Sequence, residues 1–127
     1  MCKKILIIDD ELDFTRAVRL TISIFQPGWE VIEAHDGNSG RIKFLATHPD
    51  LVLLDISMPG IDGLEVLKQL RHLSKTPIII LSARDEATYK PQALALGAND
   101  FLPKPINPPL FINTIKQELA TAHRMRN

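Results

Sequence analysis

Residues able to do chemistry follow the short apolar runs of this sequence. The acidic residues 9–11 follow the first run, Asp55 follows the second and Ser82 the third, while Lys104 stands between two prolines. Carboxylates crowded together repel one another, and a bound cation relieves that repulsion. Oxygen ligands favour Mg²⁺, which commonly binds through one or two carboxylates together with phosphate oxygens. Since a carboxylate such as Asp55 can attack phosphorus while Mg²⁺ and Lys104 neutralise the transferred oxygens, these residue types indicate phosphoryl transfer.

The elements that must position these residues are strands and helices in alternation. Residues 5–8, 51–54 and 78–81 are uninterrupted runs rich in branched residues, which is typical of central parallel strands. Residues 29–34 and 100–102 predict two weaker strands, and helical spacing lies between the strands. Five strands and five helices predict an α/β fold, a doubly wound parallel sheet with helices on both faces. In such a sheet, ligands lie beyond the carboxyl ends of the strands.

Length and composition limit the function. A chain of 127 residues with 45% apolar residues fits one domain, residues 1–127. Fifteen basic side chains balance fifteen acidic ones, so no global positive field would draw the chain onto nucleic acid or an anionic membrane. Cys2 is the sole cysteine, which excludes an internal disulfide and favours a cytoplasmic localisation. The first residues do not resemble a secretion signal, and no run approaches the roughly 20 apolar residues of a membrane span.

Four segments of the sequence carry a resemblance to a known family. They are Ile7-Ile8-Asp9-Asp10-Glu11, Leu53-Leu54-Asp55-Ile56-Ser57-Met58-Pro59-Gly60-Ile61-Asp62-Gly63, Ile80-Leu81-Ser82-Ala83 and Gly97-Ala98-Asn99-Asp100-Phe101-Leu102-Pro103-Lys104-Pro105. Over essentially its whole length the chain resembles the receiver domains of two-component response regulators, such as the chemotaxis response regulators. The resemblance implies a flavodoxin-like (βα)5 fold with strand order 2-1-3-4-5. It also implies a phosphoprotein of phosphorelay signal transduction, which is a signalling phosphoacceptor and not an enzyme.

By this resemblance the acidic residues hold a metal ion and accept phosphate. Asp9, Asp10, Asp55 and the backbone carbonyl of Ser57 would bind Mg²⁺. Asp55 would become an aspartyl phosphate, with a sensor histidine kinase, a phosphotransfer protein or a small phosphodonor as the source. Ser57 and Arg84 would border the path of the water that hydrolyses this phosphate.

The resemblance gives the remaining site residues a part in a switch. Ser82 would hydrogen-bond the phosphoryl group and Lys104 would pair with it. As Ser82 moves toward the phosphate, Phe101 would turn from an exposed to a buried position behind it. The change would alter the surface of the fourth helix, fifth strand and fifth helix for a downstream protein target. Pro105 would form a cis peptide that aims Lys104 inward.

Other interpretations of the same residues stay open. A strand-end aspartate or serine often caps a helix or satisfies a local backbone group, and Phe101 can be core filler. A flavin carrier shares the wound architecture, but the acidic residues 9–11 would repel an anion. A haloacid-dehalogenase-like phosphatase would need an aspartate two residues after Asp9, where Glu11 stands. The four histidines are scattered without ligand spacing and are interpreted as surface residues.

The chain is expected to act alone and as a monomer. The basic residues 122–127 are too few to read DNA as a folded module, which favours a stand-alone receiver. Receivers attached to winged-helix DNA-binding domains commonly pair through an arginine on the last helix, where this sequence has Thr114. The alternative is a receiver module of a longer regulator with a DNA-binding or enzymatic output domain.

Prolines and polar residues set the expected limits of two helices. Pro91 is well tolerated at a first helical position but costs roughly 3 kcal/mol inside a helix. The fourth helix is therefore expected over residues 90–96, after an extended loop at residues 84–89. A helix this short is expected to be the most mobile part of the domain. Asn107 is expected to cap the last helix, which would run through about Ala122.

Overall fold

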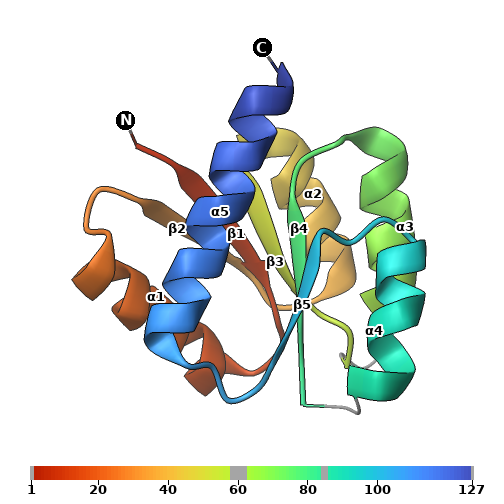
Figure 1. Cartoon of the computed structure of the whole chain (residues 1–127), viewed down its shortest axis with the longest axis horizontal. Coiled ribbons are helices and arrows are strands. Elements are labelled where there is room, and N and C mark those ends of the chain that lie inside the picture. The colour runs from red at the N-terminus through yellow and green to blue at the C-terminus, as the bar shows by residue number, and fades with distance from the viewer. Residues whose placement is uncertain (1, 58–62, 84–85, 127) are drawn as a thin grey trace.

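In the part of the chain that the structure describes, five parallel strands form one sheet between two layers of helices (Figure 1). The structure is a computed structural model and describes residues 2–57, 63–83 and 86–126. The strands are β1 (Lys4–Ile8), β2 (Glu30–Ala34), β3 (Leu51–Asp55), β4 (Ile78–Ser82) and β5 (Asp100–Pro103). The helices are α1 (Leu12–Phe25), α2 (Gly37–Thr47), α3 (Gly63–Leu73), α4 (Glu86–Ala95) and α5 (Pro108–Arg126). The order β2-β1-β3-β4-β5 confirms the predicted fold class and strand order.

The two faces of the sheet bury two separate apolar clusters. α1 and α5 cover one face, and α2, α3 and α4 cover the other (Figure 1). The helices contribute Val18, Ile22, Phe111, Ile112 and Ile115 to the first cluster, and Phe44, Val66, Leu67, Leu70 and Ala93 to the second. Successive residues of a central strand join opposite clusters, as Ile7 and Ile8 do. Burial on both faces explains why the strand sequences are uninterrupted apolar runs.

The pairing of β1 with β3 brings two acidic candidate residues to one level. Ile8 pairs with Leu54 in parallel register. The next residue along each chain is an aspartate, so Asp9 and Asp55 lie side by side at the carboxyl edge of the sheet. The expectation that the candidate residues meet at this edge follows from the parallel arrangement, in which all strands end on the same side.

Alternation along the strands divides the candidate residues between the two faces. Leu53 and Leu102 pack in the apolar cluster that faces α1 and α5. Because side chains two residues apart on a strand lie on the same face, Asp55 and Lys104 lie on this side of the sheet. Phe101 belongs to the opposite cluster, with Ile80, and Ser82 continues this second set. Asp55 and Lys104 thus lie on one side of the sheet, and the two residues predicted to form the switch lie on the other.

The prediction that the fourth helix starts near Lys90 is wrong. α4 begins at Glu86 and contains Pro91 in its interior. Of the extended loop expected at residues 84–89, residues 84–85 lie outside the described residues, and the remaining four are helical. The end of the helix at Ala95 agrees with the expected stop before Gly97 to within one residue.

Packing explains why α4 accommodates the proline. Pro91 has no N–H, so it cannot donate to the carbonyl four residues earlier. The helix nevertheless seats Ala93 fully buried in the core, with Tyr89 and Leu96 packed against the same cluster. Tertiary burial of an apolar face commonly outweighs a local helix penalty.

α5 is longer than its sequence predicted. Asn107 caps it as expected, since its Oδ1 accepts the backbone N–H of Leu110 at 3.1 Å. The helix continues past the expected end at Ala122 to Arg126. Residues 121–126 contain neither glycine nor proline and are mostly good helix formers, so nothing in them ends the helix. Neither α5 nor any other described helix combines the length and apolar character needed to cross a membrane.

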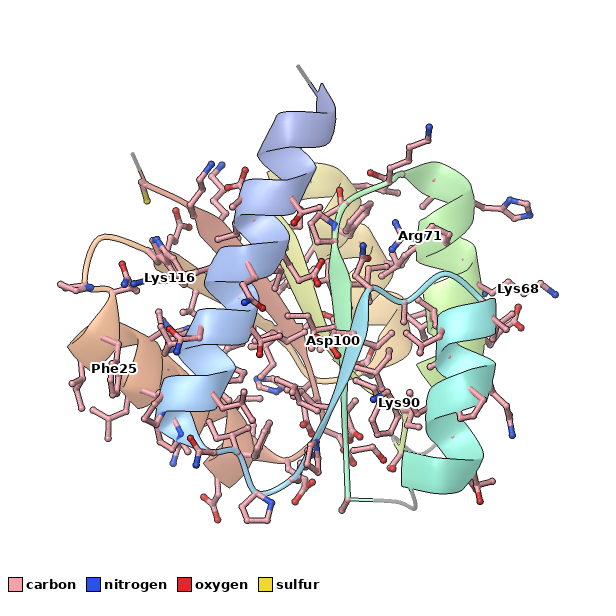
Figure 2. All side chains as sticks on the ribbon, viewed as in Figure 1. Phe25, Lys68, Arg71, Lys90, Asp100 and Lys116 are labelled. Carbon is pink, nitrogen blue, oxygen red and sulfur yellow. The ribbon has the colours of Figure 1, made fainter. Side chains whose placement is uncertain are left out.

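Arg71 of α3 joins the turns that lead into β4 and β5 (Figure 2). Its guanidinium donates to the carbonyls of Thr76 at 2.8 Å, Gly97 at 3.0 Å and Ser74 at 3.1 Å. It also donates to Oδ1 of Asn99 at 2.9 Å. Four hydrogen bonds from one half-buried side chain therefore hold together the segments that precede β4 and β5.

Candidate functional site

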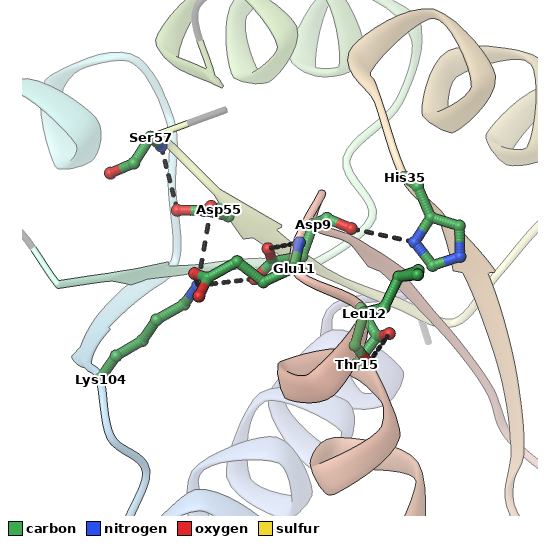
Figure 3. Close-up of polar contacts among 8 residues, drawn as sticks. All are labelled: Asp9, Glu11, Leu12, Thr15, His35, Asp55, Ser57 and Lys104. Atoms are coloured by element: carbon green, nitrogen blue, oxygen red, sulfur yellow. Dashed lines mark hydrogen bonds and ion pairs between the residues drawn. The ribbon is translucent and has the colours of Figure 1, made fainter. Parts of the chain in front are cut away.

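A buried ammonium lies among three carboxylates at the carboxyl edge of the sheet (Figure 3). The Nζ atom of Lys104 is 2.7 Å from Oδ2 of Asp9, 2.8 Å from Oε1 of Glu11 and 3.6 Å from Oδ2 of Asp55. The side chains of Lys104, Asp9 and Asp55 are 8%, 0% and 2% exposed, whereas that of Glu11 is 62% exposed. The predicted convergence of Asp9, Asp55 and Lys104 is present.

In each buried aspartate, one carboxylate oxygen accepts a hydrogen bond from the local backbone and the other faces the site. Oδ1 of Asp9 accepts the backbone N–H of Glu11 at 2.9 Å. Oδ1 of Asp55 accepts the backbone N–H of Ser57 at 3.0 Å. In both residues Oδ2 is the atom that faces Lys104. The local turns after β1 and β3 therefore orient both carboxylates toward the ammonium.

The start of α3 presses closely on the backbone that carries Asp55. A Cβ atom added to Gly63 would come within 2.6 Å of the carbonyl oxygen of Asp55 and closer still to the Cα of Ile56. Glycine at this position therefore permits the approach. Ser57 lies in the same segment, and its hydroxyl is buried with no hydrogen-bond partner among the described residues.

Burial and repulsion change the acidity of the site. The pKa of Asp55 is raised from 3.8 to about 6, chiefly by burial and further by the charges of Asp9 and Asp10, against the Ser57 N–H and Lys104. Burial alone would lower the pKa of Lys104, but its hydrogen bonds to Asp9 and Glu11 and the charge of Asp55 raise it. Lys104 is therefore a fixed positive charge, and Asp55 is an unusually basic carboxylate.

The turn after β5 delivers Lys104 to the site. The peptide between Lys104 and Pro105 is cis, as the family resemblance implied. The backbone N–H of Lys104 donates to the carbonyl of Ser82 at 2.9 Å, which joins this turn to the end of β4. The Nζ atom also lies 4.2 Å from the centre of the Phe14 ring on α1. The ammonium is thus enclosed by carboxylates and one aromatic face.

The acidic cluster could hold a metal ion. Ligand atoms of Asp9, Glu11 and Asp55 all lie within 4.8 Å of one another. These donors are carboxylate oxygens, which suit a hard ion such as Mg²⁺. Asp10 is exposed and its charge acts on Asp55, although it is not one of these three residues. The donor chemistry therefore fits the ion expected from the sequence.

The two residues assigned to the switch are buried. Ser82 is 0% exposed at the end of β4, and Phe101 is 2% exposed in the cluster that faces α3 and α4. The resemblance implied an exposed Phe101 before phosphorylation, whereas the structure has the buried arrangement. The part of Ser82 and Phe101 in a switch stays a prediction. Arg84 and motif residues 58–62 lie outside the described residues.

Sequence reasoning missed three residues that contact this site. Glu11 pairs with Lys104, although the sequence analysis gave it no role in binding metal or phosphate. Phe14, on α1, was not among the candidate site residues. The exposed ring of His35 donates from Nδ1 to the carbonyl of Asp9 at 3.1 Å. For Glu11 and Phe14 the signal was available, because both lie within one helical turn of the site aspartates. His35 directly follows β2 and carried no such signal.

Comparisons with known proteins agree with this geometry. A family model described as the response regulator receiver domain matches residues 5–116. A probable transcriptional regulator, ycf27, of Galdieria sulphuraria is 43% identical over 106 residues, which cover 84% of this chain and 41% of that protein. The transcriptional regulatory protein ResD of Bacillus subtilis is 36% identical over 119 residues, covering 94% of this chain and 49% of that protein. The chain thus spans about half or less of the length of these curated relatives.

Solved structures give the same result for the fold. A CheY-like receiver domain protein from Methanospirillum hungatei has a TM-score of 0.91 and 25% identity, covering 98% of this chain and 99% of that one. The chemotaxis protein CheY4 of Vibrio cholerae has a TM-score of 0.84 and 30% identity, covering 92% and 98%. With the family match over most of its length, the chain belongs to the receiver domain family of two-component response regulators.

Proposed function

We propose that this chain is a switch that accepts a phosphoryl group on Asp55 in the presence of Mg²⁺. The observation that carries the proposal is the orientation of Asp55, whose Oδ1 is held by the Ser57 N–H while Oδ2 faces Lys104. A sensor histidine kinase or a phosphotransfer protein would supply the phosphoryl group, and a small phosphodonor could replace it in vitro. The receiver family to which the chain belongs is a signalling family.

The chemistry is a displacement at phosphorus. Oδ2 of Asp55 attacks, its new bond to phosphorus forms, and the bond to the donor breaks with the electron pair leaving on the donor atom. The raised pKa makes Asp55 a better nucleophile than an ordinary aspartate while leaving it ionised near neutral pH. Lys104 lies 3.6 Å from Oδ2 and can neutralise charge on the transferred oxygens.

We assign the metal site to Asp9, Asp10, Asp55 and the backbone carbonyl of Ser57. Bound Mg²⁺ would neutralise phosphoryl oxygens during transfer. Support comes from the all-oxygen donor set and from the acidic cluster around Asp55. Asp10 is included because its charge acts on Asp55 and because its position on the chain matches the family motif.

Phosphorylation of Asp55 would change the structure through Ser82 and Phe101. Lys104 and Ser82 would bind the phosphoryl oxygens, and the movement of Ser82 would alter the packing of Phe101. The affected surface is that of α4, β5 and α5, which we propose as the docking surface of a downstream protein target. The phosphate must favour one arrangement over the other for this shift to occur. We propose a single receiver domain that stays monomeric, because Thr114 is buried at 5% exposure and offers no charge for pairing.

A second candidate concerns the context of the domain. The chain covers 41% to 49% of ycf27 and ResD, which are named as transcriptional regulators. This observation favours a receiver module of a longer regulator that carries an output domain. The phosphoacceptor chemistry would be the same in both cases, and only the target of the switch would differ.

The test is phosphorylation by acetyl phosphate followed by intact mass spectrometry. With Mg²⁺ present the protein should gain the mass of one phosphoryl group, and chelation with EDTA should abolish the gain. Asp55→Asn should not be labelled, whereas Asp13→Asn, an exposed aspartate on α1, should be labelled like the wild type. Equal labelling of Asp55→Asn and the wild type would refute the proposal.

A further inference from the structure

Phe14 contacts the ammonium that the site uses. The Nζ atom of Lys104 lies 4.2 Å from the centre of the Phe14 ring. The ring is half-buried in α1 and packs against the cluster under α1 and α5. A cation above the face of an aromatic ring is attracted by the ring's negative face at this distance. The contact therefore favours the present position of Lys104 beyond what the carboxylates contribute.

The partners nearest to the ammonium all come from one segment of the chain. Asp9, Glu11 and Phe14 lie at the end of β1 and the start of α1, and Nζ is within 2.8 Å of both carboxylates. Asp55 is on the neighbouring strand, and its oxygen is farther away at 3.6 Å. Lys104 is consequently held toward the β1–α1 segment and away from the residue that accepts the phosphate.

The ammonium occupies the space between the carboxylates where a cation would bind. Of the three carboxylates that surround Nζ, those of Asp9 and Asp55 belong to the proposed metal site, and that of Glu11 lies with them in the acidic cluster that could hold a metal ion. Two positive charges in one small cluster repel each other strongly. A metal ion and the ammonium therefore compete for these carboxylates, and any group that stabilises the ammonium there opposes metal binding.

We propose that Phe14 is a positioning residue that holds Lys104 in this resting place and thereby weakens Mg²⁺ binding. The inference rests on the proposed function, since it concerns the same metal and the same lysine. Loss of the ring face should release part of this restraint. A cation–aromatic contact at a partly exposed site corresponds to a change of about two- to five-fold in a binding constant.

The decisive variant is Phe14→Leu, which keeps an apolar side chain and removes the ring. Its dissociation constant for Mg²⁺, measured from amide shifts of Asp9, Asp55 and Ser57 in a magnesium titration, should fall by about two- to five-fold. Phe14→Tyr retains a ring and should bind Mg²⁺ like the wild type. Phe25→Leu makes the same substitution at the other end of α1 (Figure 2). Phe25 is 45% exposed, and its replacement should leave Mg²⁺ binding unchanged.

Whether Phe14→Leu strengthens or weakens Mg²⁺ binding distinguishes this role from simple packing. If Phe14 only supported the site, its removal would loosen the carboxylates and weaken Mg²⁺ binding. Unchanged or weaker binding by Phe14→Leu, beside a wild type that binds Mg²⁺, would overturn the inference and leave the proposed function intact. A wild type that binds no Mg²⁺ would instead refute the proposed function.

A measurement on the metal-free wild type tests the contact itself. In lysine-labelled protein, the ε-methylene protons of Lys104 should be shifted upfield by the ring current of Phe14, and addition of Mg²⁺ should change that shift. The shift does not depend on whether Phe14→Leu folds. An ordinary lysine shift for Lys104 in the metal-free protein would overturn the inference.

Discussion

Replacing Asp55 with asparagine is expected to stabilise the metal-free fold. Asp55 is 2% exposed, and its pKa is raised from 3.8 to about 6 by burial and then by Asp9 and Asp10. A carboxyl with a raised pKa binds its proton more tightly in the fold than in the unfolded chain. Its ionisation therefore lowers stability as the pH rises from about 4 to about 6. A pKa difference of about 2, at about 1.4 kcal/mol for each unit, lowers the free energy of unfolding by up to about 3 kcal/mol when Asp55 is ionised.

Asparagine removes the charge and keeps the local geometry. Its amide oxygen can still accept the Ser57 N–H, which lies 3.0 Å from Oδ1 in the wild type. In urea unfolding with EDTA near neutral pH, Asp55→Asn should be more stable than the wild type by about 2–3 kcal/mol. The gain should shrink as the pH falls and approach zero below about pH 4, where Asp55 becomes protonated in both states.

Two controls make this measurement specific. Asp13→Asn removes an exposed aspartate from the first turn of α1 and should lower stability by a few tenths of a kcal/mol, roughly up to 1 kcal/mol. Saturating Mg²⁺ should stabilise the wild type more than Asp55→Asn, because the metal compensates the carboxylate charge. Equal stabilities of Asp55→Asn and the wild type near neutral pH would refute the reasoning, as would a gain independent of pH.

Three further substitutions are expected to have measurable effects. Lys104→Met leaves three carboxylates without their cation, so urea unfolding in EDTA should show a loss of about 3 kcal/mol that Mg²⁺ reduces. An equal loss with and without Mg²⁺ would contradict this account. Arg71→Ala removes four hydrogen bonds, including those to Gly97 and Asn99, and should lower the free energy of unfolding by about 2–4 kcal/mol. Arg71→Lys should restore only part of this stability, because lysine lacks the planar guanidinium. Full recovery in Arg71→Lys would contradict it. Pro91→Ala restores a helical donor and should stabilise the chain by about 1–3 kcal/mol and raise the hydrogen-exchange protection of α4. Unchanged protection would show that the proline costs nothing in this helix.

The sequence predicted the sheet and its carboxyl edge because both follow from local patterns. Buried parallel strands are uninterrupted apolar runs, and parallel strands end on one side. Asp9 and Asp55 follow two such runs at equal register, so their meeting could be expected before the structure was known. The approach of Lys104 followed from resemblance to a family motif, since the spacing alone does not show where the turn after β5 carries its side chain.

The remaining features depend on contacts between distant segments. The partners of Lys104 depend on where α1 starts relative to β5, which places Glu11 and Phe14 beside Nζ. The prediction for the start of α4 considered only the local cost of Pro91, whereas the burial of one side of α4 outweighs that cost. The burial of Phe101 likewise reflects packing under α3 and α4, which no local pattern reports.

The central claim is that Asp55 itself forms the acyl phosphate, and locating the modified residue tests this most directly. After reaction with acetyl phosphate and Mg²⁺, sodium borohydride reduces an aspartyl phosphate to homoserine, and peptide mass spectrometry identifies the position. The account predicts homoserine at position 55, at a level that depends on Mg²⁺ and falls to background when EDTA is present. Homoserine at Asp9 or Asp10 in place of Asp55, or modification of Asp55 that persists without any divalent ion, would contradict it.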